Sequence, residues 1–214
     1  MSIINYANKE IQFKIVYYGP ALCGKTTNLS YIHSHINPGN KGDMVSLATA
    51  ADRTLFFDFL PLNAIVVQGF TTKFQLYTVP GQVIYNTTRQ LVLRSVDGVV
   101  LVADSQWEKM EENIESLKNL EENLAKQNIS LDTLPYVLQY NKRDMPHIAP
   151  VNYLEYTLNN RKVRAQSFEA TATSGFNIFS TLNAISRLLL YKFTKESDLA
   201  RKSSKTTVLM STVQ

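Results

Sequence analysis

Hydrophobic and polar residues follow each other along the chain in two patterns, one typical of strands and one typical of helices. Short apolar runs suited to buried strands lie at 11–18, 74–79, 98–103, 135–140 and 165–170. Longer amphipathic segments lie at 106–127, where Ile114, Leu117, Leu120 and Leu124 share one face, and at 177–191. Because strands that alternate with helices require parallel crossovers, the sequence predicts an α/β fold with a mainly parallel central sheet flanked by helices.

The domain organisation is simple. The chain shows no internal repeat and no long linker, which predicts one domain over residues 1–194. Residues 195–214 are polar and Ser/Thr-rich, with four basic residues against two acidic ones, and are expected to form a disordered C-terminal tail. Residues 37–53 lack periodicity and are expected to form a long loop, and loops of this length are usually either functional or disordered.

Composition narrows the class of protein. With 44% hydrophobic and 19% charged residues, the chain is suited to a folded domain rather than a disordered polymer. The single cysteine, Cys23, excludes an intramolecular disulfide framework and favours a reducing compartment. The central apolar stretch 99–103 is far shorter than the roughly 18 residues that span a bilayer, and residues 1–6 show no leader pattern. We therefore expect a cytoplasmic protein without a transmembrane segment.

Residues 19–26, Gly-Pro-Ala-Leu-Cys-Gly-Lys-Thr, match the phosphate-binding pattern G-x-x-x-x-G-K-[S/T] between a predicted strand and a helix. Glycines let the backbone N–H groups surround a phosphate, and the following helix N-terminus favours an anion. We expect Lys25 to reach the β- and γ-phosphates and the Thr26 hydroxyl to bind Mg²⁺. Cys23 lies in the same loop, where helix N–H groups can lower a thiol pKa, so a redox role is an alternative to a packing role.

A second motif selects the base. Asn141, Lys142, Arg143 and Asp144 directly follow the predicted strand 135–140. The Asp144 carboxylate can accept hydrogen bonds from the N1–H and 2-amino groups of guanine, a donor pair that adenine lacks. Beside a phosphate loop and at the carboxyl end of a strand, this motif predicts a guanine nucleotide.

With both motifs in place, the sequence resembles the Ras-like small GTPases and, within them, the MglA-type GTPases of bacterial polarity and gliding motility. The segments that carry the resemblance are 14–20, 52–61, 76–82, 102–105 and 139–144, and it covers residues 1–193. It implies a P-loop NTPase fold, namely a Ras-like small G domain. It also implies a switch that binds GTP or GDP with Mg²⁺ and hydrolyses GTP slowly alone and faster with an activator.

The resemblance implies catalytic roles for three residues. Gln82 would orient the attacking water, Lys25 would hold the phosphates, and Arg53 would act as an arginine finger supplied in cis. Without the resemblance, a solvated loop arginine is the preferred interpretation of Arg53. Slow basal hydrolysis is expected, because the loop that carries Arg53 has to move before the guanidinium can act.

The resemblance also implies a nucleotide-binding set. Thr26 and Thr54 would bind the metal, and Gly81 would donate its N–H to the γ-phosphate. Thr171 and Ala172 would close the base site, with the Ala172 N–H meeting guanine O6. The full set is Gly19, Ala21, Leu22, Cys23, Gly24, Lys25, Thr26, Thr27, Thr54, Gly81, Asn141, Lys142, Asp144, Thr171 and Ala172.

Two positions depart from the general small-GTPase pattern. Thr78 stands where Ras-like proteins carry an Asp that helps to hold Mg²⁺, and this threonine is shared by MglA-type proteins. We expect the change to weaken magnesium binding, since outer-shell partners are typically worth about 10–100-fold in affinity or activity. Thr173 replaces the lysine that stacks on the ribose side of the base in the family.

The expected partners follow from the switch region. Phe56 and Phe57 are adjacent and therefore point to opposite faces of a strand, so at least one should face a partner or rearrange. The resemblance implies a roadblock-fold activator of MglB type that binds as a homodimer, polarity or motility effectors, recruitment to a cell pole, and a sliding strand near 62–69.

Three alternatives stay open. Thr78 motivates a nucleotide-binding regulatory module with little or no hydrolysis. An ATP-dependent P-loop kinase would share the phosphate loop, but residues 141–144 argue against it. The net charge of +4 alone suggests a nucleic-acid binder. Because half of that charge lies in the last twenty residues and Lys25 and Arg53 are assigned to phosphates, we expect no nucleic-acid partner.

Overall fold

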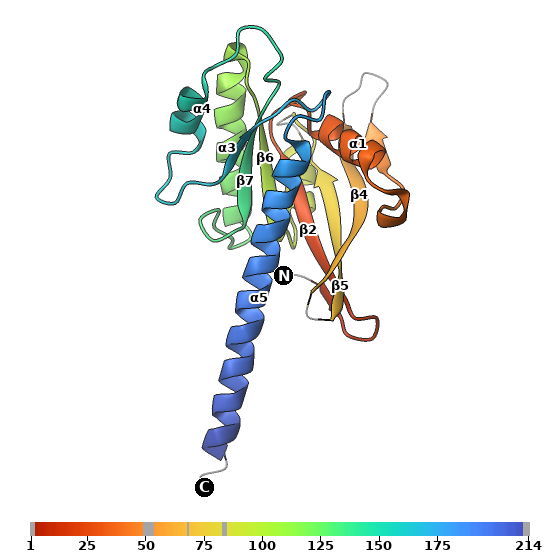
Figure 1. Ribbon diagram of the computed structural model, residues 1–214. Coiled ribbons are helices and arrows are strands. Elements are labelled where there is room, and N and C mark those ends of the chain that lie inside the picture. Colours follow the sequence, from red (N-terminus) through yellow and green to blue (C-terminus); the bar gives the residue numbers. More distant parts are fainter. Residues whose placement is uncertain (1–2, 49–53, 68, 83–84, 212–214) are drawn as a thin grey trace.

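The computed structural model describes residues 3–48, 54–67, 69–82 and 85–211. Within them the chain forms one eight-stranded sheet covered by helices (Figure 1). The strands are β1 (Ile3–Asn5), β2 (Glu10–Tyr18), β3 (Val45–Ala48), β4 (Thr54–Val67), β5 (Phe70–Thr78), β6 (Gly98–Asp104), β7 (Tyr136–Asn141) and β8 (Ser167–Glu169). The helices are α1 (Lys25–His35), α2 (Asn86–Val92), α3 (Met110–Ala125), α4 (Val151–Leu158) and α5 (Ile178–Ser211), with short 3-10 helices η1 (Pro38–Asn40) and η3 (Trp107–Lys109).

The sheet order is β3-β4-β5-β2-β6-β7-β8, with β1 added antiparallel beside β2. The strands from β5 to β8 in that order run parallel, whereas β4 is antiparallel to both β3 and β5. Every residue of β6 and β7 is buried, as expected for parallel strands that are covered on both faces. The prediction of a mainly parallel sheet flanked by helices is confirmed.

Two apolar cores lie on the two faces of the sheet. On one face α1 and α5 pack against β2, with Leu29, Ile32 and Ile185 fully buried near Ile15. On the other face α2, α3 and α4 pack against the same strands. Because both faces are filled, the parts of the central strands that are open to ligands lie beyond their carboxyl ends.

Helix α3 buries a different stripe from the one that the sequence predicts. Ile114 is 43% exposed, whereas Leu120 and Leu124 are buried as predicted. Asn113 and Asn123 take part in the buried side, where Asn113 Nδ2 donates to the Asp104 carbonyl oxygen over 2.8 Å. The prediction was wrong at Ile114, because hydrogen-bonded asparagines occupy part of the face that apolar spacing alone would assign to leucine and isoleucine.

Two further segments differ from their predicted form. The segment 37–53, expected as a loop, contains η1 and β3, and β3 is held by antiparallel pairing with β4. Helix α5 continues to Ser211 and projects beyond the body of the domain (Figure 1). The expected boundary between 194 and 195 therefore falls inside a helix, and the division of the chain there stays a prediction. None of the helices in the described part of the chain is long and apolar enough to cross a membrane.

Candidate functional site

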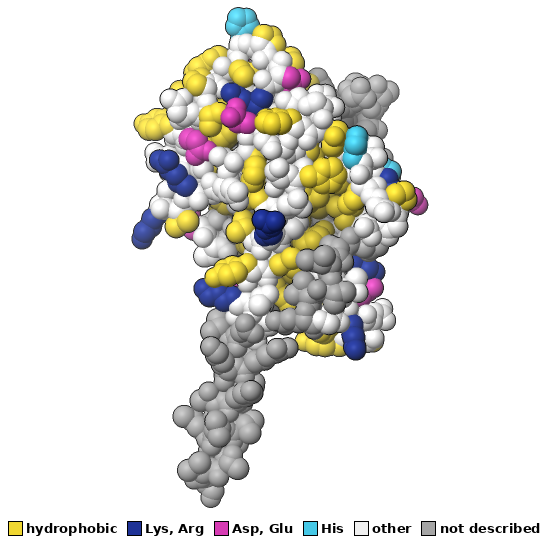
Figure 2. Space-filling view, in the orientation of Figure 1, with side chains coloured by type: hydrophobic (Ala, Val, Ile, Leu, Met, Phe, Trp, Pro, Cys, Tyr) yellow, Lys and Arg dark blue, Asp and Glu magenta, His cyan; other side chains and the backbone are white. Residues whose placement is uncertain are grey.

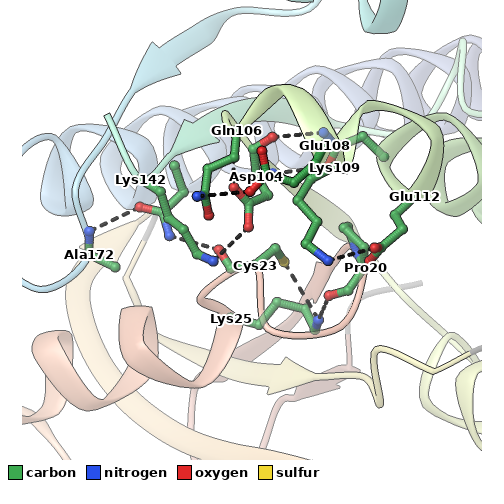
Figure 3. Close-up of polar contacts among 12 residues, drawn as sticks. Pro20, Cys23, Lys25, Asp104, Gln106, Glu108, Lys109, Glu112, Lys142 and Ala172 are labelled. Atoms are coloured by element: carbon green, nitrogen blue, oxygen red, sulfur yellow. Dashed lines mark hydrogen bonds and ion pairs between the residues drawn. The ribbon is translucent and has the colours of Figure 1, made fainter. Parts of the chain in front are cut away.

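The sequence motifs meet at one edge of the sheet (Figure 3). The loop 19–24 follows β2 and leads into α1, Asp104 ends β6, and Asn141 ends β7. Because β2, β6 and β7 are parallel neighbours, their carboxyl ends lie side by side. The fold thus brings three distant parts of the sequence to one place.

Two glycines shape the phosphate loop, because no side chain fits at either position. Gly19 has φ 152°, and a Cβ there would lie 2.1 Å from the Val102 carbonyl oxygen. Gly24 has φ 100°, directly before α1, and its Cβ would lie 2.2 Å from Asn141 Nδ2. The loop is therefore a backbone cradle that opens onto a helix N-terminus, which is the arrangement that suits a phosphate.

Lys25 is folded over this cradle. Its side chain is buried, and its Nζ donates to the Gly19 carbonyl oxygen over 3.0 Å and to the Pro20 carbonyl oxygen over 2.6 Å. Figure 3 shows the contact with Pro20. Burial lowers the pKa of the Lys25 ammonium. The Cys23 thiol lies 3.6 Å away and is also buried, and burial raises its pKa. Burial thus opposes the thiolate form of Cys23 and favours a packing role over the redox alternative.

Asn141 ties the phosphate loop to the base side of the site. Its Nδ2 donates to the Cys23 carbonyl oxygen over 2.8 Å, and its Oδ1 accepts from the Ala172 N–H over 2.9 Å. Asn141 is 1% exposed, so both hydrogen bonds are shielded from water. The Ala172 N–H, which the resemblance assigns to guanine O6, is therefore engaged by Asn141 in this conformation.

Lys142 and Asp104 form an ion pair beside the phosphate loop. Lys142 Nζ lies 2.6 Å from Asp104 Oδ2, and the Asp104 side chain is almost fully buried (Figure 3). Lys142 has φ 65°, a left-handed conformation that turns the chain sharply after β7. Asp144 follows on the exposed side of this turn. The turn thus separates a fixed Lys142 from a solvent-facing carboxylate that a ligand can reach.

The buried carboxylate of Asp58 lies against Thr26, the threonine that is expected to bind the metal. The Thr26 hydroxyl donates to Asp58 Oδ2 over 2.5 Å, and the Thr78 hydroxyl donates to the same oxygen over 2.8 Å. The Asp58 N–H in turn donates to the Thr78 hydroxyl over 2.8 Å. Asp58 belongs to β4. The next residue, Phe59, pairs with Tyr77 of β5, so Asp58 stands opposite Thr78.

Gly81 lies against the phosphate loop, and Arg89 holds it there. A Cβ at Gly81 would lie 2.2 Å from Ala21 Cα, so the two backbones are in close contact. Arg89, from α2, is 1% exposed and donates from Nε to the Pro80 carbonyl oxygen over 2.9 Å and from Nη2 to that of Gly81. Gln82 follows as a half-buried residue.

The sequence model of the Ras family matches residues 14–191, which includes every motif described above. The chain belongs to the Ras family. Members of this family bind guanine nucleotides, and the chain is therefore a small GTPase of the Ras type. The backbone cradle, the threonine hydroxyl beside a carboxylate and the solvent-facing Asp144 all fit a guanine nucleotide with Mg²⁺.

Individual relatives agree with this assignment. The chain is 53% identical over 195 residues to the mutual gliding-motility protein MglA of Myxococcus xanthus. This match covers 91% of the chain and 99% of that protein. It is 27% identical over 140 residues to the Ras-related protein Rab-13 of Rattus norvegicus, covering 65% of the chain and 66% of that protein. It is also 27% identical over 201 residues to the Ras and EF-hand domain-containing protein of Xenopus tropicalis, of which 25% is covered.

The structure brings together most of the predicted nucleotide-binding residues of this Ras-family site. Asn141 contacts the phosphate loop and the Ala172 loop directly, and Thr171 is buried beside them. Arg53 lies outside the described residues, and Thr54 is described only as the first residue of β4. Leu22 and Thr27 are exposed at the rim of the phosphate loop.

Sequence reasoning missed Asp58, Asp104 and Arg89. Each is a charged residue that the structure buries. For Asp58 a signal exists in the sequence, because it is a charged residue inside the apolar run 55–62, within a segment that carries the resemblance. Asp104 and Arg89 give no comparable signal, since their roles depend on pairing across the fold.

Proposed function

We propose that this Ras-family protein is a GTP-hydrolysing switch of MglA type, which controls cell polarity or motility through partners that distinguish its GTP and GDP forms. The observation that carries the proposal is Asn141, which links the phosphate loop at Cys23 to the base loop at Ala172. A single side chain therefore makes the fit of the base and the shape of the phosphate cradle depend on each other. The 53% identity to an MglA protein supports the cellular role.

Nucleotide binding divides between two ends of the site. At the phosphate end, the backbone N–H groups of 19–26 and the Lys25 ammonium compensate negative charge, and Lys25 exchanges its carbonyl partners for phosphate oxygens. At the base end, Asp144 accepts hydrogen bonds from the N1–H and 2-amino groups of guanine. Lys142 keeps its position beside the base through Asp104.

Hydrolysis requires groups around the γ-phosphate. Bound Mg²⁺ supplies charge neutralisation to the β- and γ-phosphates, with Thr26 and Thr54 as its protein ligands. The Gly81 N–H stabilises the γ-phosphate, and Gln82 orients the attacking water. Arg53 neutralises the charge that develops on the γ-oxygens, and a roadblock-fold activator of MglB type, acting as a homodimer, brings it into place. Such an arginine is worth about 10³–10⁵ in rate.

The base assignment is tested by Asp144→Asn. The wild type is expected to carry GDP or GTP after purification, seen by chromatography of the denatured protein. Asp144→Asn is expected to bind xanthosine nucleotides more tightly than guanosine nucleotides, because an amide can donate to the 2-oxo group of xanthine where a carboxylate cannot. Unchanged preference for guanosine would contradict the assignment.

The reaction is tested by single-turnover GTP hydrolysis with and without the activator. Stimulated phosphate release that falls by at least about 10³-fold in Arg53→Ala supports the finger. Gln82→Ala tests the water-orienting role in the same assay. No product in either condition, in protein that binds GTP, would instead favour the regulatory binding module.

Among the described residues, the face drawn in Figure 2 shows no cationic surface suited to a nucleic-acid partner. On the face drawn in Figure 2, the described Lys and Arg side chains are scattered among apolar and acidic ones and form no continuous stripe. Phosphate contacts need clustered cations, because affinity grows with each neutralised phosphate. Salt-dependent binding of DNA or RNA by the purified protein would contradict this expectation.

A further inference from the structure

Asp58 is a carboxylate that the fold buries completely, at 0% exposure, in the middle of β4. Removing a carboxylate from water is costly unless hydrogen bonds or a cation compensate it. Here one oxygen, Oδ2, accepts from the hydroxyls of both Thr26 and Thr78. The two donors come from α1 and β5, so the carboxylate joins three elements at the phosphate end of the site.

The contact with Thr26 bears on the metal. In P-loop proteins the hydroxyl oxygen of this residue binds Mg²⁺, and a carboxylate completes the site. A hydroxyl that donates its proton to Asp58 turns its lone pairs away from Asp58, and those lone pairs are what a cation needs. Since Mg²⁺ lies about 2.0–2.1 Å from its ligand oxygens and keeps several waters, Asp58 would be within reach of a metal-bound water.

Thr78 fixes the direction of this carboxylate. Its hydroxyl donates to Asp58 Oδ2 and accepts from the Asp58 N–H, each over 2.8 Å. The antiparallel register that pairs Phe59 with Tyr77 places the two residues opposite each other. Within the described residues, no group of three or more His, Cys, Asp or Glu could hold a metal. A metal held here together with nucleotide phosphates would meet the Thr26 hydroxyl and the Asp58 carboxylate.

We propose that Asp58 supplies the carboxylate of the magnesium shell, acting through Thr26 and a metal-bound water, with Thr78 as its positioning residue. This proposal rests on the proposed function, because it concerns the metal bound with the nucleotide. The carboxylate comes from β4, the strand paired with β5, and lies directly opposite Thr78. Thr78, which stands where Ras-like proteins carry an Asp, then supports the carboxylate of Asp58, and the site keeps a carboxylate.

The test is the Mg²⁺ dependence of nucleotide retention. Release of a fluorescent GDP derivative from the purified full-length protein is followed over a series of free Mg²⁺ concentrations and in EDTA. In Asp58→Asn, the Mg²⁺ concentration for half-maximal retention is expected to rise by about 10–100-fold, the usual effect of an outer-shell partner. Release in EDTA is expected to stay near the wild-type rate, because without metal the carboxylate has no cation to serve.

Variants of two buried threonines on β5 provide a matched comparison. Thr78→Val removes the positioning hydroxyl and is expected to raise the Mg²⁺ midpoint by about tenfold, whereas Thr78→Ser keeps the hydroxyl and the midpoint. Thr72→Val is the control, because Thr72 is equally buried and its hydroxyl has no hydrogen-bond partner among the described residues. Its midpoint is expected to stay at the wild-type value.

The outcomes separate this proposal from the proposed function. If Mg²⁺ slows release from the wild type and equally from Asp58→Asn and Thr78→Val, Asp58 is not part of the metal shell, while the switch function stands. If Mg²⁺ has no effect on the wild type, both proposals are overturned. A midpoint shift in Thr72→Val as large as that in Thr78→Val would also overturn the positioning role, since it would reflect strand packing alone.

Discussion

Arg89 donates a hydrogen bond from its guanidinium to the carbonyl oxygen of Gly81, so a helix residue holds the backbone that precedes Gln82. The same guanidinium donates to the Pro80 carbonyl oxygen and to Asn119 Oδ1, the latter over 2.7 Å. Gly81 in turn packs against Ala21 of the phosphate loop. Helix α2, helix α3 and the phosphate loop are thereby connected through one buried cation.

Replacing Arg89 should therefore affect stability and hydrolysis together. Arg89→Met leaves the Pro80 and Gly81 carbonyls without their donor, and we expect the free energy of unfolding to fall by about 2–4 kcal/mol. The rate of single-turnover hydrolysis should fall by a larger factor than the affinity for GDP, because the backbone that precedes Gln82 loses its support. Denaturant unfolding and phosphate release measure the two effects. Arg94→Met is the control, since Arg94 is exposed in the same region; an equal effect there would contradict the interpretation.

Asn141 should be essential to nucleotide binding, because it hydrogen-bonds both the phosphate loop and the loop that contains Ala172. Asn141→Ala leaves the Cys23 carbonyl and the Ala172 N–H without partners in a buried place. We expect a loss of about 2–4 kcal/mol in stability, and at least a tenfold loss of guanine-nucleotide affinity measured by fluorescence titration. Asn160→Ala, at an exposed asparagine, should change neither quantity. Wild-type affinity in Asn141→Ala would refute the linking role.

The phosphate loop should not tolerate a side chain at Gly24. With φ 100° and a Cβ position 2.2 Å from Asn141 Nδ2, Gly24→Ala introduces both backbone strain and a collision. We expect guanine-nucleotide affinity to fall by at least about tenfold, because the strain alone is of order 1–3 kcal/mol. Gly39→Ala is the matched control, since the nearest atom to its Cβ would be Asn37 Oδ1 at 3.6 Å. Isothermal titration with GDP compares the two variants.

Stability at alkaline pH should depend on Tyr136. Burial raises the pKa of Tyr136 to about 12, and the negative charges of Asp132 and Glu155 add to the effect. Because the folded state holds this proton more tightly than the unfolded state, whose tyrosines ionise near pH 10, the stabilisation is complete below about pH 10. It is lost as the pH rises from there towards 12.

Tyr136→Phe tests this dependence, because phenylalanine cannot ionise. The Tyr136 hydroxyl has no hydrogen-bond partner among the described residues, so the variant should lose less than about 1 kcal/mol at pH 7. Its unfolding free energy should then fall less steeply than that of the wild type above about pH 10. Tyr156→Phe, at a 73% exposed tyrosine, should follow the wild-type curve. Identical slopes in Tyr136→Phe and wild type would contradict the assigned cause.

The local motifs of this protein can be read directly from the sequence, because each is a contiguous run with its own chemistry. Residues 19–26 predict a phosphate cradle through glycine conformation, and residues 141–144 predict recognition of guanine through one carboxylate. The alternation of buried strands and amphipathic helices determines the α/β class, since each pattern can bury its apolar residues in only one type of element. These features require no knowledge of which strands are neighbours.

Only the tertiary structure decides which distant residues complete the site. In the sequence, Thr78 indicates that the site lacks the carboxylate that Ras-like proteins have at this position. The antiparallel register of β4 and β5 brings the Asp58 carboxylate to its side. Ile114 illustrates the same limit in α3, where buried asparagines take places that periodicity assigns to apolar residues. Strand register and hydrogen bonds between elements depend on the packing of the whole chain, and no local pattern encodes them.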